Sequence, residues 1–531
     1  RENILEKVLL RDGEITLHTR ERSNKWQMYI NIKGTDVFVR KSTGTSNLDD
    51  AAQIATKYYD QLKSKATSAS NSASGVIGWV DERLPILSFV RDHLTNYYAP
   101  KNFNFWYFFG SLAFMILFLQ IFTGIFLAMH YKPDAKLAFD SVEFIMRDVN
   151  LGWLIRYMHS TGASAFFVVV YLHMFRALMY GSFKKPRELI WLFGVFIYLA
   201  LMAEAFMGYL LPWGQMSYWG AQVIINLFTT IPFIGPELGV WIRGDFAISD
   251  PTLTRFFALH IVAVPMVILL LVILHLAALH TVGSNNPDGV EIKKYKDENG
   301  VPLDGVPFHP YYTVKDFVGI GVFLFLFSTT VFFMPEMGGY FLEHANFIPA
   351  NPLVTPEHIA PVWYFTPFYS ILRAIPDPAF GALAMALSIV VLFFLPWIDN
   401  NPIKSIRYRS MLFRINLFVF VAGFLILGYL GVKAPTPLYS ALALRFSEMY
   451  FIFFALLFFY SKSRGNFFSY IFAGAIISLI AIYDLTRINF DNYILIITGL
   501  AFVCAFILFM TISPLYTNLN KEKEVPERVT G

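Results

Sequence analysis

Residues 156–175 have the sequence RYMHSTGASAFFVVVYLHMF, an apolar run that contains two histidines, His159 and His173. The two positions are fourteen apart, and 14 × 100° = 1400°, which is about 40° short of four full helical turns. Both rings therefore project from one helix face, about 21 Å apart along the axis. Histidine inside a membrane-spanning helix is costly and usually functional. The spacing favours two cofactors stacked across one bilayer.

A second apolar run contains His260 and His275, which are fifteen apart. This spacing overshoots four turns by about 60°, and Pro265 offers a local irregularity that brings the two faces together. One complete crossing lies between the two runs, so both run in the same direction. We therefore expect His159 to meet His260 at an outer level and His173 to meet His275 at an inner level.

Two imidazoles at each level predict a bis-histidine haem site. Such iron is six-coordinate with no open position, which suits electron transfer rather than oxygen chemistry. The chain has one cysteine, Cys504, and no Cys-x-x-Cys-His, so we expect haem bound without thioether links. A single membrane histidine can instead serve as a helix–helix hydrogen bond, but two matched pairs disfavour that explanation.

Glycines at the same period supply an independent test. Gly110 and Gly124 are fourteen apart, as are Gly194 and Gly208. Such glycines allow a flat macrocycle to approach the backbone at both levels. Ordinary packing of small residues between helices is the alternative.

Three arginines lie three to five residues from the histidines: Arg156, Arg176 and Arg255. We expect them to pair with haem propionates, because a guanidinium binds carboxylates in a bidentate manner. Snorkelling of the side chains to the membrane interface is the alternative.

The composition indicates that much of the chain lies in a lipid bilayer, which acts as an apolar solvent. Of 531 residues, 56% are hydrophobic and 15% are charged, whereas soluble domains have about 45–50% and 25%. About 20 apolar residues cross a bilayer. The net charge of +4 is too small and too scattered to indicate nucleic-acid binding. We predict ten spans, at about 105–130, 153–179, 188–210, 254–281, 315–335, 379–397, 411–431, 441–460, 466–484 and 491–513.

Basic residues in the loops orient this array. The loop after the first span, on the opposite side, also carries Lys132, Lys136 and Arg147, which reduces the difference in basic residues between the two sides. The distribution nevertheless predicts that both termini lie on the cytoplasmic side. The loops after the second, fourth, sixth and eighth spans carry Lys184, Lys185, Arg187, Lys293, Lys294, Lys296, Lys404, Arg407, Arg409, Lys462 and Arg464.

The N-terminal segment, residues 1–66, is polar and of mixed charge. Alternation over residues 26–40 predicts a β-hairpin, and residues 49–63 have helical spacing, so we expect a small ββα unit. Residues 67–79 are expected to be a flexible linker, because the sequence around them is rich in Ser and Ala.

Two short stretches of this segment, Gly13-Glu14-Ile15 and Lys41-Ser42-Thr43-Gly44-Thr45, resemble the N-terminal arm region of tyrosine-type phage integrases. The resemblance includes no catalytic motif. It favours a fused fragment without a role in the main function, with DNA binding as the alternative.

The membrane part carries four long motifs that resemble cytochrome b of the respiratory cytochrome bc complex, with similarity from about Trp79 to Lys462. They are RYMH at 156–159, GYLLPWGQM at 208–216 followed by WGA at 219–221, HTVGSNNP at 280–287 and HPYYTVKD at 309–316. The resemblance implies an all-α membrane protein whose helical bundle has a di-haem four-helix core. It implies a haem-binding domain at 80–285 and a C-terminal domain at 286–462, and leaves two extra helices and a polar tail at 463–531.

The resemblance also implies the ligands and the partners. His159 and His260 correspond to ligands of an outer, low-potential b haem, and His173 and His275 to those of an inner, high-potential b haem. The implied reaction is a Q cycle coupled to proton translocation. The implied partners are quinone, membrane lipid, a Rieske iron–sulfur protein, a cytochrome c-type subunit and a second copy of the complex, in a bacterial inner (cytoplasmic) membrane. No nucleic acid is expected for the main domain.

The implied outer quinol site comprises Tyr209, residues 219–224, Trp363 and Tyr364. The family usually has Pro-Glu-Trp-Tyr at the last of these segments, but this chain has Val362 in place of the glutamate that receives a quinol proton. A valine cannot accept a proton. Glu357 and His358 are the nearby candidates for that role, with a solvated loop as the alternative.

The implied inner quinone site comprises His280, Lys315 and Asp316. A histidine and an aspartate that face one quinone suit a reduction that consumes two protons. Alternatively, Asp316 is a charge favoured by a helix N-terminus. Phe108 stands where many relatives have a polar residue, so one contact of this site is expected to be absent.

Two other classes of membrane protein remain as alternatives. A di-haem membrane anchor of a quinone-linked dehydrogenase has four or five spans and no Pro-x-Trp-Tyr segment. A transporter with functional histidines has no haem, so a reduced-minus-oxidised spectrum discriminates it from a cytochrome.

Overall fold

The computed structural model describes residues 4–20, 23–32, 38–71, 76–85, 96–461, 466–488 and 491–530. The chain divides into two compact units, Arg1–Asn96 and Tyr97–Gly531.

The N-terminal unit contains one antiparallel sheet in the order β1-β2-β3-β4, with α1 packed on one face. Ile15, Leu17 and Ile30 of the sheet are fully buried together with Ala51 and Ala55 of α1. The elements are β1 (Ile4–Leu10), β2 (Ile15–Arg20), β3 (Ser23–Asn31), β4 (Phe38–Ser42), α1 (Leu48–Asn71) and α2 (Val76–Asp81).

The structure contains two strands more than the predicted ββα unit, and the helix of this unit ends later than predicted. The predicted hairpin corresponds to the β3–β4 pair, although its turn residues 33–37 lie outside the described residues. Two further strands, β1 and β2, extend the sheet. The predicted linker is largely wrong, because α1 continues to Asn71 and α2 begins at Val76. Only residues 72–75 of that segment lie outside the described residues.

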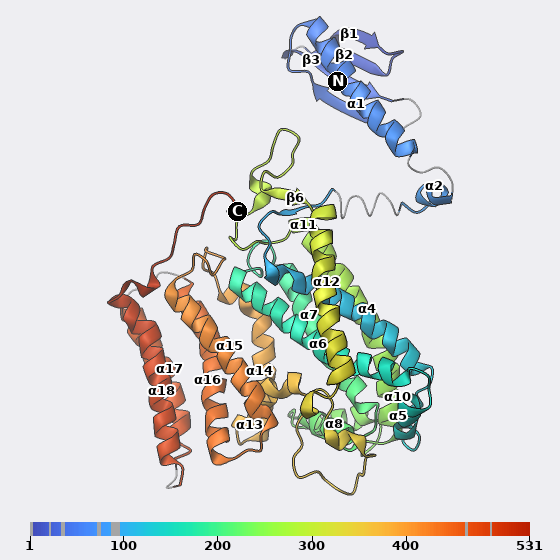
Figure 1. Cartoon of the computed structure of the whole chain (residues 1–531). Coiled ribbons are helices and arrows are strands. Elements are labelled where there is room, and N and C mark those ends of the chain that lie inside the picture. Colours follow the sequence, from blue (N-terminus) through green and yellow to red (C-terminus); the bar gives the residue numbers. More distant parts are fainter. Residues whose placement is uncertain are drawn as a thin grey trace. The chain divides into compact units, whose positions relative to one another are not determined.

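The second unit is a bundle of long helices (Figure 1). Ten helices in the described part of the chain are long and apolar enough to cross a membrane, which confirms the predicted number. They are α4 (Phe108–Ala128), α6 (Gly152–Tyr180), α7 (Glu188–Leu210), α10 (Asp250–Ala258) continued by α11 (Val264–Val282), α12 (Phe308–Phe333), α14 (Pro378–Ile398), α15 (Met411–Val432), α16 (Pro437–Tyr460), α17 (Asn466–Leu485) and α18 (Tyr493–Ile512).

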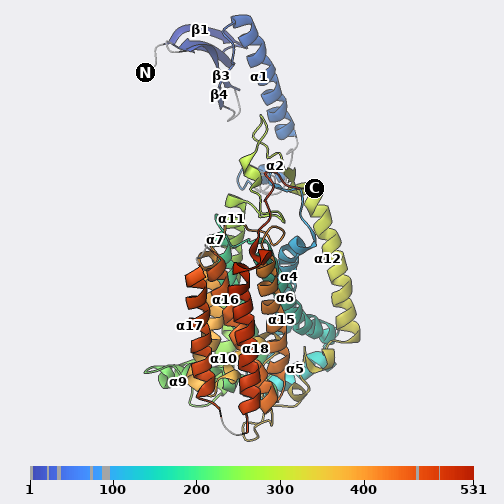
Figure 2. The same ribbon diagram turned by 90° about the vertical axis from the view of Figure 1, so that its left-hand side faces the viewer.

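Two helix pairs, α4–α6 and α7–α11, make the core of the bundle. The short helix α13 (Thr366–Ala374) packs against α14, α15 and α16. The last helical hairpin, formed by α17 and α18, packs against α16 through α18. Figure 2 shows α17 and α18 side by side along α16. The loop helices α5 (Ala138–Arg147), α8 (Gln215–Thr229) and α9 (Gly235–Arg243) lie with α13 toward one end of the bundle (Figure 1 for α5, α8 and α13, and Figure 2 for α9).

The beginning and the end of this unit meet at the opposite end, which we call the inner end. Strand β5 (Tyr98–Pro100) pairs with β6 (Gly305–Pro307). The adjacent Asp304 carboxylate binds Lys101 at 3.2 Å and Arg528 of the C-terminal tail at 2.6 Å. The end that carries α5, α8, α9 and α13 is the outer end.

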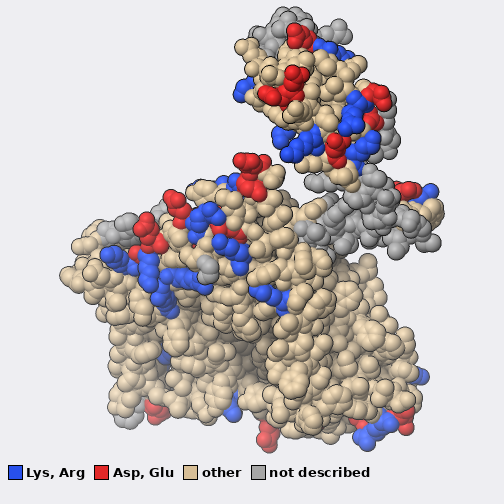
Figure 3. Space-filling view, turned by 45° about the horizontal axis from the view of Figure 1, so that its top comes forward, with Lys and Arg blue, Asp and Glu red and all other residues tan. Residues whose placement is uncertain are grey.

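Charged residues gather at the inner end, above a flank that is almost entirely uncharged in Figure 3. Large apolar side chains cover the sides of the helices, as shown by Phe118 (63% exposed), Phe325 (72%) and Leu479 (71%). Such a surface requires lipid around it. The chain is an integral, multi-pass membrane protein. Lys462 and Arg464 of the predicted basic loops lie outside the described residues.

The fourth span has an irregular turn directly before Pro265, the residue at which the sequence predicts an irregularity. Residues Leu259–Ala263 form a π-helical turn, in which the Val264 amide bonds to the Leu259 carbonyl, five residues back. Pro265 follows in the first turn of α11. A π turn holds one residue more than an α turn. The extra residue compensates for the fifteen-residue spacing of the two histidines on this span.

Candidate functional site: paired histidines and an outer cavity

Four histidines meet in two pairs between the core helices α6 and α11. The ring centres of His159 and His260 are 6.3 Å apart with planes at 86°, and those of His173 and His275 are 6.5 Å apart at 60°. Two imidazoles that each bind one metal ion at roughly 2 Å have ring centres roughly 6 Å apart. Each pair is therefore spaced to fit one metal ion between its two rings, and coordination of iron by these histidines stays a prediction.

The outer pair is held by hydrogen bonds from the Nδ1 atoms. His159 Nδ1 lies 2.9 Å from Thr123 Oγ1, whose hydroxyl hydrogen is donated to the Leu119 carbonyl at 2.7 Å. His260 Nδ1 lies 2.9 Å from the backbone carbonyl of Glu204. Engaging Nδ1 leaves Nε2 for a metal and fixes the orientation of the ring.

Each of the four predicted glycines faces one of these rings. The contact is with the imidazole, on the side where a side chain would stand, so the glycines make room for the histidines. The pairs are Gly110 with His173, Gly124 with His159, Gly194 with His275 and Gly208 with His260. The predicted approach of a macrocycle to these glycines stays a prediction.

A cavity of about 550 Å³ opens at the outer level. Its size is in the range that holds a cofactor or small ligand, about 300–1,000 Å³. Residues of the outer histidine pair and of the Pro-Val-Trp-Tyr segment line this one cavity. Its lining includes His159, His260, Arg156, Gly124 and Gly208, together with Tyr209, Phe341, Asn346, Val362 and Tyr364.

The three predicted propionate partners differ in position. Arg156 lines the outer cavity. Arg176 donates to Ser182 Oγ at 3.1 Å and lies over the Tyr107 ring, while its buried Nε has no hydrogen-bond partner among the described residues. An unpaired buried donor of this kind fits an anionic group. Arg255 does not fit its predicted role, because it is exposed and donates to the Trp241 carbonyl at 2.7 Å.

Of the aromatic residues of the predicted outer site, Tyr209 and Tyr364 line the cavity, whereas Trp219 and Trp363 are not among its lining residues. Tyr209 has a buried hydroxyl with no hydrogen-bond partner among the described residues. The Tyr364 ring stacks on Phe167 at 3.9 Å, and Trp363 Nε1 donates to Ser164 Oγ at 3.1 Å. These contacts fix the Trp-Tyr pair against α6.

The two predicted proton acceptors do not line this cavity. Glu357 is exposed. His358 Nε2 lies 2.9 Å from the Val432 carbonyl at the end of α15, which ties the ring to another helix. The structure therefore does not bring either side chain to the place where Val362 lines the cavity.

A loop that the sequence did not single out contributes to the lining of the outer cavity. Phe341 and Leu342 line it, and the Phe341 ring stacks with Trp363 at 6.3 Å. Asn346 also lines it, and is pinned to α8 by two hydrogen bonds with Ser217, at 2.7 and 2.8 Å. Half-buried Glu343 lies between these residues. Loop residues of this kind have no periodic pattern that reveals them in a sequence.

The residues of the predicted inner site lie near the inner end. The ring centres of His280 and Tyr97 are 4.5 Å apart, with the planes tilted at 45°. Burial raises the pKa of the Tyr97 phenol, and the hydrogen bond from the Ser284 amide opposes this effect. Asp316 accepts from Ser111 Oγ at 2.9 Å, and Lys315 donates to Tyr311 at 2.9 Å.

Phe108 fills space at this site rather than contributing a polar contact. Its ring lies against Gly319 of α12, where an added Cβ would be 3.2 Å from Cδ1.

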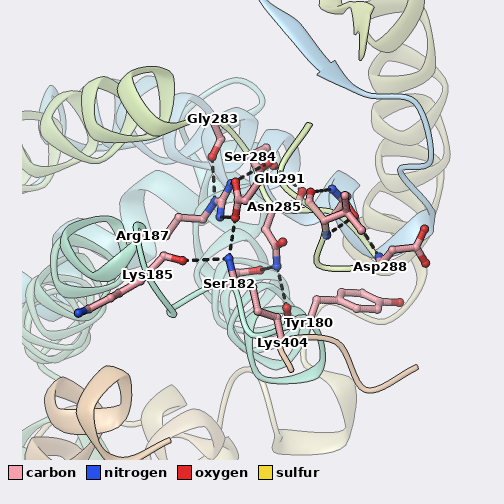
Figure 4. Close-up of polar contacts among 12 residues, drawn as sticks. Tyr180, Ser182, Lys185, Arg187, Gly283, Ser284, Asn285, Asp288, Glu291 and Lys404 are labelled. Carbon is pink, nitrogen blue, oxygen red and sulfur yellow. Dashed lines mark hydrogen bonds and ion pairs between the residues drawn. The ribbon is translucent and has the colours of Figure 1, made fainter. Parts of the chain in front are cut away.

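A polar network holds the segment that follows His280 (Figure 4). Arg187 donates to the carbonyls of Gly283 and Ser284 and makes two bonds to Glu291, at 2.6 and 2.8 Å. Burial alone would raise the pKa of Glu291, but the hydrogen bonds and charges of Arg187 and Lys404 outweigh it and lower this pKa to about 2. The segment is therefore clamped by a charged pair.

Comparisons with known proteins place the whole arrangement in one family. The model described as cytochrome b/b6/petB matches residues 94–283, and the one described as cytochrome b (C-terminal)/b6/petD matches residues 349–451. Cytochrome b of Allochromatium vinosum is 58% identical over 73% of this chain and 95% of its own length. Cytochrome b of Rickettsia prowazekii is 53% identical over 71% and 92%.

A solved structure supports the same assignment. A chain of a hyperthermophilic respiratory Complex III superposes with a TM-score of 0.68 at 38% identity, over 72% of this chain and 98% of that one. The matches cover most of each relative, and the two histidine pairs lie within the first matched family model. The chain belongs to the cytochrome b family of respiratory electron-transfer complexes.

Proposed function

We propose that this chain oxidises quinol in the outer cavity and reduces quinone at the inner end, with electrons passing between two b-type haems held by the histidine pairs. The outer haem is the low-potential one and the inner haem the high-potential one, in a Q cycle coupled to proton translocation. The observation that carries the proposal is the outer cavity, which is lined both by the His159–His260 pair and by residues of the Pro-Val-Trp-Tyr segment.

In this proposal, the protein contributes to electron transfer by fixing the positions of the two haems and by keeping water away from them. His159 and His173 fix two ligand levels about 21 Å apart on one helix. A bis-histidine haem supplies a reversible one-electron carrier with no open coordination site. Buried side chains such as Ile116, Phe167 and Val169 exclude water from the core helices. Arg156 and Arg176 provide a cation at each level for the propionates.

The outer cavity is suited to an apolar ring with two hydroxyls. Phe167, Val362 and Tyr364 give it apolar walls, and Tyr209 presents a hydroxyl. The Trp363–Ser164 bond keeps the Trp-Tyr pair in place. At the inner end, His280 and Asp316 are the groups that supply protons to a reduced quinone, with Lys315 as a further donor.

The proposed partners follow from the family. A Rieske iron–sulfur protein takes one electron of each quinol at the outer end and passes it to a cytochrome c-type subunit. The complex is expected to be a homodimer in the bacterial inner membrane. The rival function, a di-haem anchor of a dehydrogenase, is disfavoured by the ten candidate spans and by a cavity at the Pro-Val-Trp-Tyr segment.

The test is quinol-dependent reduction of cytochrome c by the purified complex. We expect both b haems to be reduced by quinol when the inner site is blocked, and turnover to stop when the outer site is blocked. A complex that reduces quinone but never oxidises quinol would support the dehydrogenase anchor instead.

A further inference from the structure

The last described residues of the chain, 521–530, cross the inner end of the bundle as a segment without helix or strand, which we call the strap. Near its start, Asn401 donates to the Glu522 carboxylate at 2.7 Å, and the Lys523 amide donates to the Tyr408 carbonyl at 2.8 Å. Its end lies beside β6 (Figure 1). The strap therefore passes from the loop between α14 and α15 to the ribbon formed by β5 and β6.

Two buried carboxylates bind the far end of the strap. Arg528 donates to Asp304 through Nε at 2.6 Å and through Nη2 at 3.0 Å. Thr530 donates to Asp288 through its amide at 2.9 Å and through its hydroxyl at 2.8 Å. Val529, between them, is buried, and its amide donates to Asp304 at 3.3 Å. Three consecutive residues are therefore attached by hydrogen bonds to charged acceptors, which are stronger than bonds between neutral groups.

The same two carboxylates also bind the start of the second unit. Lys101 Nζ lies 3.2 Å from the Asp304 carboxylate, and Asn102 Nδ2 donates to Asp288 at 2.9 Å. Both acids are almost completely buried, with 2% of Asp304 and 1% of Asp288 exposed. A buried carboxylate requires several donors, and here the donors come from both ends of the unit. The two acids therefore join the strap to the residues that follow β5.

Both acids remain ionised at neutral pH. The hydrogen bond from Arg528 is the main reason why the pKa of Asp304 is lowered to about 2. Burial alone would raise the pKa of Asp288, but the hydrogen bonds from Thr530, Tyr408 and Arg407 outweigh it and lower this pKa. The attachments of the strap therefore stay in place over the physiological pH range.

The two acids belong to the two chain segments that carry the proposed inner quinone site. Asp288 lies in the segment that leads away from His280. Asp304 directly precedes β6, which leads into α12 with Lys315 and Asp316. By binding both acids, the strap links the segment of His280 to the segment of Asp316.

Contacts of Tyr97 extend this link to the ring of His280. Tyr97 directly precedes β5, and its carbonyl accepts from the amide of Phe308, the first residue of α12, at 2.9 Å. Its ring centre lies 4.5 Å from that of His280, and its hydroxyl accepts from the Ser284 amide at 3.2 Å. A displacement of the β5–β6 ribbon therefore displaces the ring that packs against His280.

We propose that the strap is a positioning element of the inner quinone site. Through its bonds to Asp304 and Asp288, it sets the separation of His280 from Asp316. This inference rests on the proposed function, in which the inner end binds and reduces quinone. A quinone that is bonded at both of its oxygens requires two groups at a fixed separation, because a displacement of about 1 Å is enough to break a hydrogen bond. The strap itself contributes no group to the chemistry.

The double variant Arg528→Gln with Thr530→Val, in the intact complex, tests this role. When an inhibitor blocks the outer site, the short-chain quinol decylubiquinol can reduce the b haems only through the inner end. We expect the decylubiquinol concentration that gives half of the maximal rate to rise at least about fivefold, because hydrogen bonds to charged groups are lost. The rate through the outer end, measured with the inner site blocked, should equal that of the wild type. The control is Glu527→Gln, which removes a charge from an exposed neighbour in the strap.

A strap that only supports the fold gives a different pattern. In that case the melting temperature falls, but the half-saturating concentration at the inner end equals that of the wild type, or both ends lose activity to the same extent. Either result would overturn the proposal.

A single variant replaces the double variant if the latter does not assemble. Arg528→Lys keeps the positive charge but cannot bind Asp304 through two parallel bonds, so it must also raise the half-saturating concentration at the inner end. An unchanged value in Arg528→Lys would decide against the strap. Wild type whose haems decylubiquinol cannot reduce through the inner end would instead refute the proposed function itself.

Discussion

Gly208 of α7 lies against the ring of His260 so closely that no side chain fits between them. An added Cβ would overlap Cε1 of the ring and stand 3.0 Å from both ring nitrogens. We therefore expect Gly208→Ala to turn the His260 ring out of its position and to remove or broaden the signal of the outer haem, because something must shift at such a distance.

The control for this substitution is Gly321→Ala in α12, where nothing lies within 4 Å of an added Cβ. Potentiometric titration of the purified protein measures both b haems separately. A normal low-potential component in Gly208→Ala would contradict the described packing of α7 on α11.

Arg187 clamps the segment after His280 with a geometry that lysine cannot reproduce. Its planar guanidinium binds two oxygens of Glu291 and two backbone carbonyls, whereas an ammonium has no such fork. Arg187→Lys is expected to weaken inner-site inhibitor binding about tenfold, since a charged hydrogen bond contributes about 1.5–3 kcal/mol. Arg147→Lys, at an exposed pair with Glu143, is the control. Equal affinity in both variants would exclude the clamp as a determinant of the inner site.

The contribution of Glu291 to the stability of the folded protein should not change with pH in the physiological range. Its pKa in the folded protein is about 2, below the value of about 4.3 in an unfolded chain. The stabilisation by its ion pairs is therefore complete above about pH 4.3 and is lost as the pH falls toward 2. The melting temperature of Glu291→Gln should stay below that of the wild type by a constant amount from pH 5 to 8. A difference that shrinks within this range would contradict the assignment.

Asp484 of α17 attaches the last helical hairpin to α16. It is fully buried and makes two bonds of 2.5 Å to Arg445. Breaking a buried pair costs about 3–5 kcal/mol, so Asp484→Asn should lower the melting temperature in detergent by several degrees. Asp491→Asn, at an exposed site near the start of α18, should not. Arg445 also pairs with half-buried Glu448 at 3.2 Å. The combination Arg445→Met, Asp484→Leu and Glu448→Gln, which leaves no unpaired charge, is therefore expected to recover stability, and its failure would argue for a role beyond attachment.

The N-terminal unit has its own core and is expected to be dispensable for electron transfer. Ile15, Leu17 and Ala55 are fully buried within it. A chain that lacks residues 1–75 should retain both haems and the full rate of quinol oxidation. Loss of quinol oxidation with intact haems would show that the unit acts in the main reaction.

The histidine pairs could be predicted because spacing along a helix converts directly into angle and height. The same arithmetic showed that His260 and His275 would point in directions about 60° apart on a regular α-helix. Pro265 indicated where an irregular turn could bring them onto one face. The π turn at Leu259–Ala263 confirms that inference. Local rules were enough, since both partners of each pair belong to long regular helices.

Features that depend on tertiary contacts could not be predicted from the sequence. Phe341 and Leu342 line the outer cavity because the loop after α12 is fixed to α8 through Asn346, which no local pattern records. Strand β1 was missed because its apolar residues are consecutive rather than alternating. The linker prediction failed because alanine favours helix, so α1 continues through its Ser/Ala-rich end to Asn71.

The central claim is that two b haems stand one above the other between α6 and α11. Redox titration of the α-band in the wild type and in His173→Ala tests it most directly. The wild type should show two b-type components of different potential, and His173→Ala should lose the higher one while the lower persists. No b-type band in the wild type, or two normal components in His173→Ala, would contradict the account.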